Sequence, residues 1–234
     1  MISQCLTPTL PNGVSSLGSA NGAPTRHDFS SRDTMRVSSI DAEFQKLLAY
    51  VRQSAARGRA PQVVGVTSCE RGDGVSTIAA NLASVAVRHS GLHVLLVDAH
   101  ALRPSLHRTM ATPLSPGLSE LIAGTADLPE CLYDASNELL TFLPAGIGRA
   151  VGDVEESRDN TSFWESIRGE FGLTIVDLPP VRDLVSCPLS IEDFDGLLLV
   201  VAAQRTTANI VTQAAAELRQ AGARLLGAVF NGVR

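Results

Sequence analysis

Short apolar runs alternate with longer amphipathic stretches along most of this chain. The runs are rich in valine, isoleucine and leucine and cover residues 62–67, 93–98, 173–177, 197–203 and 225–231. Continuous apolar runs of this length are typical of strands that are buried on both faces of a sheet. The intervening segments with helical spacing cover residues 76–89, 161–171 and 209–220. This alternation predicts the α/β class, with a mostly parallel sheet and helices on both of its faces.

The N-terminal part of the chain has a different pattern. Residues 1–38 are rich in serine, proline, glycine, threonine and asparagine and lack apolar periodicity, so we interpret them as a disordered tail. From Ile40 onward, apolar residues recur every three or four positions, which predicts an amphipathic helix ending near Gly58 and Pro61. The sequence therefore predicts one folded domain, over residues 39–234.

Composition excludes several classes of function. The chain has 234 residues and a formal net charge of −5, and its basic residues are scattered, so we expect no direct binding to nucleic acid or to anionic lipid. No window approaches the roughly 20 apolar residues of a membrane span, and the N-terminus lacks the features of a signal peptide. We therefore expect a cytoplasmic protein without a membrane span.

Polar residues gather where the predicted strands end. The segment 68–77 follows the first run, while Asp98, Asp177 and Asn231 end three of the others. Ligands of open α/β sheets bind beyond the carboxyl ends of the strands. We therefore expect a binding site at this edge of the sheet.

The segment Gly72–Thr77, "GDGVST", resembles a phosphate-binding loop. Gly72 and Gly74 allow backbone amides to wrap a phosphate, and Ser76 and Thr77 supply hydroxyls at the start of a helix. Val75, however, stands where such loops have lysine, and Cys69 stands where they have their first glycine. The alternative is an ordinary strand-to-helix turn. The aspartates at two strand ends favour a Mg²⁺–nucleotide site, with Gly72, Asp73, Gly74, Val75, Ser76 and Thr77 as its nucleotide-binding residues.

Several blocks of the chain resemble one family in the right order. The blocks are "VTSCERGDGVSTIAANLA", "LLVDAHALRPSLH", "GLSELIAG", "FGLTIVDLPPV" and "GARLLGAVFNGV". Together they are similar to the bacterial tyrosine kinase family, the cytoplasmic ATPase module of exopolysaccharide co-polymerases, which is related to the MinD and ParA ATPases. The resemblance covers about residues 40–234 and implies a P-loop NTPase domain that uses ATP and Mg²⁺.

The resemblance also implies roles for individual residues. Ser76, Asp98 and Asp177 would hold Mg²⁺, with Asp98 as the catalytic candidate if the protein is active, and Asn231 would contact adenine. Each residue has an alternative role. Asp98 and Asp177 are also suited to capping loops, and Asn231, which precedes Gly232, is also suited to a turn.

Two departures from the family pattern concern the site itself. Val75 replaces the lysine, and the sole lysine of the sequence is Lys46, in the N-terminal helix. His100 replaces the second acid of the family's Asp-x-Asp motif, and Arg71 lies outside the donor geometry of the loop. Because a phosphate-clamping charge contributes several kcal/mol in the transition state, we expect catalysis to be lost or nearly lost. Binding of ATP and Mg²⁺ is expected to be weakened or lost, and it stays possible because the backbone amides of the loop do not depend on Val75.

Two further departures concern signalling and assembly. The chain ends at Arg234 without the clustered tyrosines of autophosphorylating members, and we interpret Tyr50 and Tyr133 as structural. The family's ring-forming run keeps an acid at Glu43 but has Ala49 at its last basic position. A homo-oligomer is compatible with the sequence, but a ring formed through this run is disfavoured.

Three hypotheses about function follow. The first is a degenerate, kinase-like protein, a pseudokinase, that regulates or scaffolds exopolysaccharide or capsule synthesis and export. It would lie in the cytoplasm, at the inner face of the plasma membrane, through a membrane co-polymerase or chain-length regulator as partner. The second is an atypical active ATPase or protein tyrosine kinase. The third, a MinD- or ParA-like positioning ATPase, is disfavoured because Glu70 stands where those proteins have a signature lysine.

Overall fold

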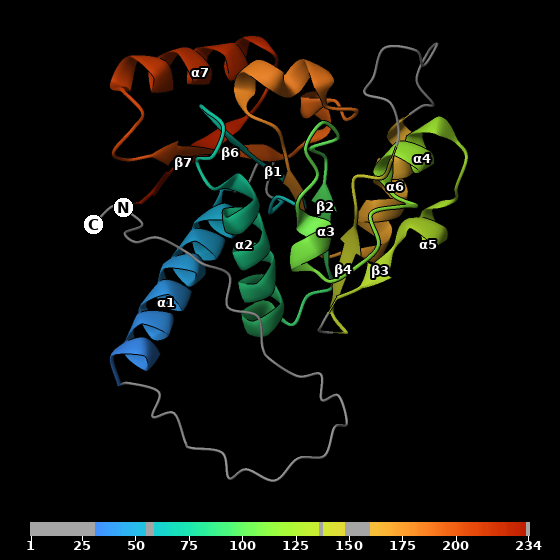
Figure 1. Ribbon diagram of the computed structural model, residues 1–234, viewed down its shortest axis with the longest axis horizontal. Helices are drawn as coiled ribbons and strands as arrows, with labels where there is room; N and C mark the ends of the chain where they lie inside the picture. Colours follow the sequence, from blue (N-terminus) through green and yellow to red (C-terminus); the bar gives the residue numbers. More distant parts are fainter. Residues whose placement is uncertain (1–30, 55–58, 136–137, 148–159, 233–234) are drawn as a thin grey trace, which may run out of the picture.

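The computed structural model describes residues 31–54, 59–135, 138–147 and 160–232. In this part of the chain a seven-stranded sheet lies between two layers of helices (Figure 1). All neighbouring strands are parallel except β3 and β4, which are antiparallel. The predicted fold class, a mostly parallel sheet with helices on both faces, is therefore confirmed.

The sheet has the strand order β3-β4-β2-β5-β1-β6-β7. Its strands are β1 (Val63–Ser68), β2 (Val94–Asp98), β3 (Tyr133–Asp134), β4 (Leu140–Leu143), β5 (Leu173–Asp177), β6 (Gly196–Ala202) and β7 (Leu225–Asn231). The α-helices are α1 (Ser31–Gln53), α2 (Val75–Ser90), α3 (Leu106–Thr109), α4 (Leu118–Ala123), α5 (Leu128–Cys131), α6 (Asn160–Glu170) and α7 (Ala208–Gln220). Two 3₁₀-helices, η1 (Val181–Ser186) and η2 (Ile191–Asp193), follow β5.

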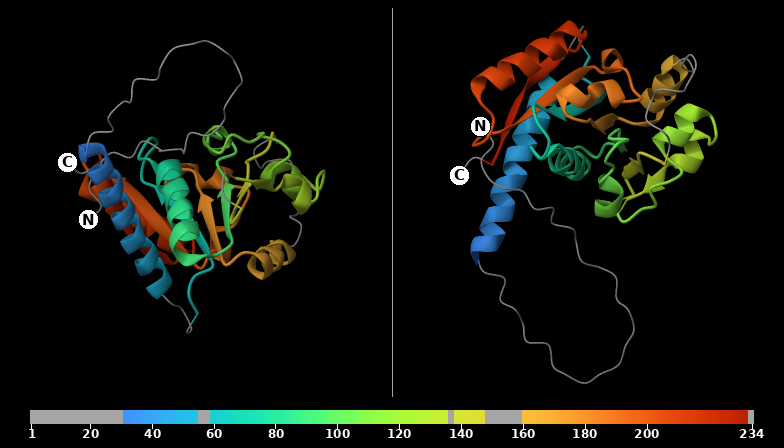
Figure 2. Two further views of the ribbon diagram at one scale, coloured as in Figure 1. Left: turned by 90° about the horizontal axis from the view of Figure 1, so that it is seen from below. Right: turned by 45° about the horizontal axis from the view of Figure 1, so that its top comes forward.

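The sheet separates two apolar cores, because successive strand side chains point to opposite faces. In β1, Val64 and Val66 pack with the helices α1 and α2 on one face. Val63, from the same strand, belongs to the core on the other face, which includes Ile167 of α6 and Leu218 of α7. Figure 2 shows α1 and α2 side by side on one face and α7 on the opposite face.

All five predicted strands and the three helices between them are present, with ends shifted by a residue or so. The expectation that every strand is buried on both faces is wrong for β7. Most of its residues are partly or fully exposed, because it is the edge strand of the sheet. The short elements β3, β4 and α3 to α5 were not predicted, since segments of two to six residues carry no readable periodicity.

Helix α1 begins at Ser31, well before the predicted start near Ile40, and ends at Gln53. A helix that is nucleated by packed residues such as Phe44 and Val51 gains one hydrogen bond for each residue added. It can therefore extend into polar sequence. The predicted disordered tail overlaps this helix at residues 31–38, and residues 1–30 lie outside the described residues. None of the described helices is long and apolar enough to cross a membrane.

Asp41 joins α1 to the end of α2. Its carboxylate pairs with Arg88 and lies 2.9 Å from Nε2 of His89. Burial raises the pKa of Asp41, but hydrogen bonds from His89, Arg88 and Gln45 outweigh this effect and hold the pKa below its ordinary value. We expect Asp41→Ala to lower the free energy of unfolding by about 1 kcal/mol at neutral pH, as judged from urea unfolding.

The pH dependence of this effect has a defined sign. Because the folded-state pKa of Asp41 lies below the unfolded-state value, its contribution is present at neutral pH and is lost as the pH falls through the folded-state pKa. The difference between wild type and Asp41→Ala should therefore shrink in acid. Asp134→Ala, at an exposed acid of β3, is the matched control. A difference that persists unchanged at acid pH would contradict this account.

Candidate functional site: a cleft at the start of helix α2

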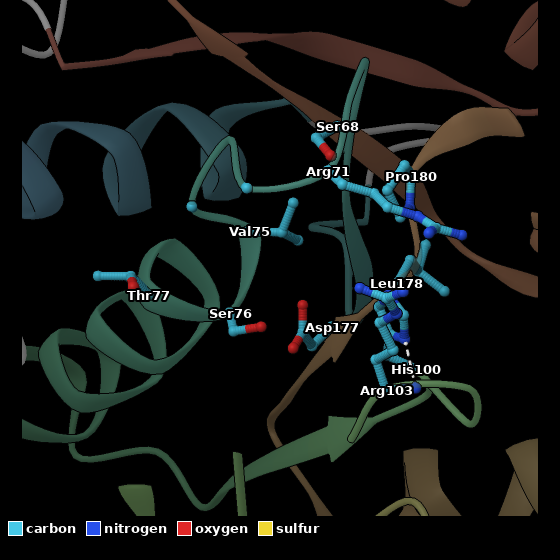
Figure 3. A pocket seen from close by; sticks show the side chains of 12 residues that line it. Ser68, Arg71, Val75, Ser76, Thr77, His100, Arg103, Asp177, Leu178 and Pro180 are labelled. Carbon is cyan, nitrogen blue, oxygen red and sulfur yellow. Dashed lines mark hydrogen bonds between the residues drawn. The ribbon is translucent and has the colours of Figure 1, made fainter. Parts of the chain in front are cut away.

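A cleft of about 330 Å³ lies beyond the carboxyl ends of β1 and β5 (Figure 3). One side is formed by the loop Gly72–Thr77 and the first turn of α2. The other side is formed by His100 and Arg103, from the loop after β2, and by residues 178–180 after β5. Asp177, the last residue of β5, lies between the two sides. The structure thus brings the predicted loop and one of the two predicted aspartates into one cavity, at the predicted edge of the sheet.

The loop has the backbone conformation of a phosphate cradle. Gly72 and Gly74 have φ angles of 81° and 95°, in the left-handed region that residues with a Cβ rarely adopt. Gly74 is also the N-cap of α2, and it makes no side-chain capping hydrogen bond to the helix. The first amides of a 16-residue helix are therefore left without a side-chain cap at the cleft, where the helix dipole also favours an anion.

The side chain of Asp73 is not available to bind a phosphate. It is buried, and its carboxylate accepts hydrogen bonds from the backbone N–H of Glu70 at 3.1 Å and from Arg205 at 2.9 Å. Arg205 also donates to the carbonyl oxygen of Arg71, at 3.3 Å. The Asp73 carboxylate therefore fixes the shape of the loop, and only its backbone is suited to contact a phosphate. Arg205 could not be identified from the sequence, because it comes from a loop more than a hundred residues away.

Asn231, at the end of β7, also supports the loop. Its side-chain amide donates to the carbonyl oxygen of Asp73 at 2.8 Å, and a Cβ at position 74 would clash with the same amide. A side chain at position 74 would thus displace the Asn231 amide, in addition to the strain of the positive φ angle. Asn231 is not among the residues that line the cleft, and its role in contacting adenine stays a prediction.

Val75 and Ser76 occupy the positions that face the cleft at the start of α2. Val75 lines the cleft and also packs against the core beneath α1 and α2. The Ser76 hydroxyl accepts a hydrogen bond from the Ser105 hydroxyl at 3.3 Å and points toward Asp177 (Figure 3). Position 75 therefore presents an apolar side chain to the cleft, where a phosphate-binding loop presents an ammonium group.

Asp177 is the least satisfied polar residue of the site. It is 1% exposed, and neither carboxylate oxygen has a hydrogen-bond partner within the described residues. Burial raises the pKa of Asp177 well above its ordinary value, and the neighbouring charge of Asp98 raises it further. The Ser76 hydroxyl is near enough to oppose these effects, although it does not reach hydrogen-bonding geometry. A buried carboxylate without partners, aimed at a cavity, is suited to bind a cation.

Asp98 lies beside Asp177 across the pair β2 and β5, but its carboxylate is already engaged. It accepts hydrogen bonds from the backbone N–H groups of His100 at 3.0 Å, Ser105 at 3.1 Å and Leu106 at 3.1 Å. Burial raises the pKa of Asp98, and these three hydrogen bonds oppose that effect. Asp98 does not line the cleft, so the loop-capping alternative describes its geometry, and its predicted roles in metal binding and catalysis stay predictions.

The residues present fit a Mg²⁺–phosphate group by their chemistry. Ser76 and Asp177 offer a hydroxyl and a carboxylate oxygen, the ligand types that Mg²⁺ prefers, and Mg²⁺ takes its remaining ligands from water and phosphate oxygens. No group of three or more histidine, cysteine, aspartate or glutamate side chains is placed to hold a metal by itself in the described part of the chain. A cation at this cleft would therefore depend on the anion bound with it.

Comparison with known proteins agrees with this geometry. No family model matches the chain. The tyrosine-protein kinase CpsD of Streptococcus agalactiae is 28% identical over 180 residues, which cover 75% of this chain and 76% of that protein. The tyrosine-protein kinase YwqD of Bacillus subtilis is 25% identical over 195 residues, which cover 83% of this chain and 82% of that protein. Over most of its length, the chain is therefore similar to bacterial tyrosine kinases.

Solved structures show the same fold. The BceF tyrosine kinase domain superposes with a TM-score of 0.65 at 26% identity, covering 86% of this chain and 78% of that one. The septum site-determining protein MinD from Pyrococcus horikoshii, complexed with Mg-ADP, superposes with a TM-score of 0.57 at 22% identity, covering 73% and 70%. The chain therefore shares the fold of the BceF kinase domain and of the MinD ATPase.

Both tyrosines of the chain have structural contacts. The Tyr50 hydroxyl donates to the carbonyl oxygen of Leu226 at 2.5 Å, and the Tyr133 hydroxyl donates to that of Pro116 at 3.3 Å. Burial raises the pKa of Tyr133. The interpretation of these tyrosines as structural agrees with these hydrogen bonds.

Proposed function

We propose that this protein binds ATP with Mg²⁺ at the α2 cleft but turns it over poorly, and that it acts as a pseudokinase-like regulator or scaffold of exopolysaccharide synthesis. The observation that carries this proposal is the combination at one cavity of uncapped α2 amides and the buried, unpartnered Asp177 with an apolar Val75. The first two features are suited to bind phosphate and metal. The third removes a charge that phosphoryl transfer uses.

Binding does not require the missing lysine. The backbone amides of residues 72–77 and the α2 dipole supply phosphate affinity whatever the side chain at position 75. The loop is also braced in this conformation by contacts that no ligand has to form, since Asp73 pairs with Arg205 and Asn231 donates to the loop backbone. Such preorganisation lowers the cost of binding.

Catalysis requires more than the cleft supplies. The ammonium group is absent at Val75, and the sole lysine, Lys46, pairs with Glu43 on α1. The second acid of the family motif is replaced by His100, and the first, Asp98, is held by three backbone amides. Electrostatic groups of this kind each contribute about 3 kcal/mol to a transition state. We therefore expect turnover to be lower than in a complete site by at least two orders of magnitude.

A membrane co-polymerase is the partner that we propose. The relative EpsB of Ralstonia solanacearum is 26% identical over 192 residues, which cover 82% of this chain and 26% of that protein. In EpsB the matching segment is thus part of a much longer chain. We infer that this protein works with a membrane polysaccharide co-polymerase or chain-length regulator, which holds it at the inner face of the membrane.

An active ATPase or kinase is the second candidate. The observation that favours it is the presence of two arginines, Arg71 and Arg103, among the residues that line the cleft. Phosphate release by the purified protein distinguishes the two candidates. Release at about 1 s⁻¹ or faster, the rate of a complete kinase site, that is abolished by Asp177→Ala would support the active enzyme and contradict the pseudokinase proposal.

Restoring the lysine tests the cleft directly. We expect Val75→Lys to raise the affinity for Mg²⁺–ATP about tenfold, because a charge-assisted hydrogen bond to phosphate contributes roughly 1.5–3 kcal/mol. Titration with a fluorescent ATP analogue measures the affinity. Val185→Lys adds the same charge at a side chain that is 89% exposed on η1 and outside the cleft lining, and it should bind like wild type. An unchanged affinity in Val75→Lys would contradict phosphate binding at this loop.

A further inference from the structure

Two arginines, Arg71 and Arg103, line the cleft. Arg103 has no ion-pair partner within the described part of the chain. It lines the side of the cleft that faces the start of α2 (Figure 3). Arg71, the other arginine, donates through Nε to Asp183 at 2.8 Å, so its charge is already balanced. His100 lies beside Arg103, and Asp177 lies between them and Ser76.

The backbone around Arg103 is held in place on both sides. Asp98 binds the N–H of His100 before it and those of Ser105 and Leu106 after it. The N–H of Arg103 itself donates to Nδ1 of His100 at 3.1 Å. The loop therefore presents the Arg103 side chain from a fixed backbone position, which reduces the entropy that is lost when the guanidinium binds a ligand.

We propose that Arg103 binds the terminal phosphate of a nucleoside triphosphate and so takes the place of the lysine that is absent at position 75. The proposal rests on the proposed function of the cleft. A planar guanidinium pairs with two phosphate oxygens at once, and it keeps its charge at all physiological pH values. The loop and the first α2 amides hold the inner phosphates from one side, Arg103 reaches the terminal phosphate from the other, and Asp177 lies on the floor between them.

This arrangement has a consequence for ligand preference. Because the loop Gly72–Thr77 and the first α2 amides hold the inner phosphates, the phosphate that extends across the cleft to Arg103 is the terminal group of the ligand. Arg103 therefore distinguishes a triphosphate from a diphosphate. The protein would respond to the state of the nucleotide even where it does not hydrolyse it.

Paired titrations with ATP and ADP test this assignment. Wild type, Arg103→Gln and the control Arg219→Gln, an exposed arginine on α7, are titrated with fluorescent ATP and ADP analogues in Mg²⁺. We expect Arg103→Gln to lower ATP affinity about tenfold and to change ADP affinity by less than about twofold. Arg219→Gln should match wild type with both ligands. Arg103→Lys, which keeps the charge, should keep the preference for ATP.

A rescue experiment separates phosphate binding from a structural role. A lysine at position 75 lies on the opposite side of the cleft, so the double variant Val75→Lys/Arg103→Gln should recover the ATP affinity that Arg103→Gln loses. If Arg103→Gln loses ATP and ADP affinity equally and the double variant does not recover it, the assignment is overturned. The assignment is also overturned if Arg103→Gln binds ATP as tightly as wild type does. Wild type that binds neither nucleotide would overturn the proposed function itself, and this assignment with it.

Discussion

Replacing Asp177 with asparagine is expected to stabilise the nucleotide-free protein while abolishing its Mg²⁺-dependent binding of ATP. The carboxylate is 1% exposed, has no hydrogen-bond partner among the described residues, and lies beside Asp98 across β2 and β5. The folded state therefore bears the cost of a buried charge that a ligand-bound cation would relieve. Removing that charge should raise the free energy of unfolding by about 1–3 kcal/mol.

The sign of the pH dependence identifies the cause. Because burial and Asp98 raise the folded-state pKa of Asp177, protonation favours the folded state. The stabilisation that protonated Asp177 contributes is complete below the unfolded-state pKa of this carboxyl group. It is lost as the pH rises through the folded-state pKa. The advantage of Asp177→Asn over wild type should thus be largest above the folded-state pKa and should vanish in acid, as measured by urea unfolding without Mg²⁺.

The matched control for this variant is Asp134→Asn, which makes the same change at an exposed acid of β3 and should leave stability unchanged. Adding Mg²⁺ and ATP should stabilise wild type and Asp134→Asn, since a ligand that binds the folded state raises its stability. Asp177→Asn should gain nothing from the same addition. If Asp177→Asn is less stable than wild type at neutral pH, the account of a buried, unsatisfied charge is contradicted.

Replacing Asp98 with alanine is expected to have the opposite effect, a loss of about 3 kcal/mol in the free energy of unfolding. The carboxylate accepts hydrogen bonds from three backbone N–H groups, at His100, Ser105 and Leu106. Alanine leaves these donors without an acceptor, and Leu106 itself is buried, so water cannot replace all of the bonds. Thermal and urea unfolding in the absence of nucleotide measure the loss.

Asp98→Asn refines this test. Asparagine keeps one acceptor oxygen but places an NH₂ group against backbone donors, so we expect a loss smaller than that of alanine and still measurable. If Asp98 acted only as a metal ligand, both variants would bind Mg²⁺–ATP poorly and would unfold like wild type without nucleotide. That outcome would contradict the structural role that we assign to Asp98 and would favour the metal-ligand role.

Most of the fold could be predicted from the sequence because its signals are local. The runs that became β1, β2, β5 and β6 are continuous and apolar, and these strands are buried on both faces in the structure. The run at 225–231 has the same appearance, yet β7 is an exposed edge strand. The composition of a segment indicates that it prefers a strand. It does not indicate whether that strand will have a neighbouring strand on one side or on both.

The site was predicted less completely. The loop Gly72–Thr77 and Asp177 could be identified because glycine and acid positions relative to a strand are readable along the chain. Arg103 and Arg205 could not, because their contacts with the cleft and the loop depend on how distant segments meet. Arg205, for example, binds the carboxylate of Asp73 across 132 positions of sequence.

The sequence by itself determined the class of fold, the edge of the sheet where a ligand would bind, and the absence of lysine from the phosphate loop. These features depend on residue type and short-range spacing. The tertiary structure alone decided what the two strand-end aspartates do. Asp98 and Asp177 occupy equivalent strand ends and face each other in register, yet one accepts three backbone hydrogen bonds and the other accepts none from the described residues. The reason is physical: a carboxylate is satisfied or left open by the loop that folds over it, and that loop is placed by long-range packing.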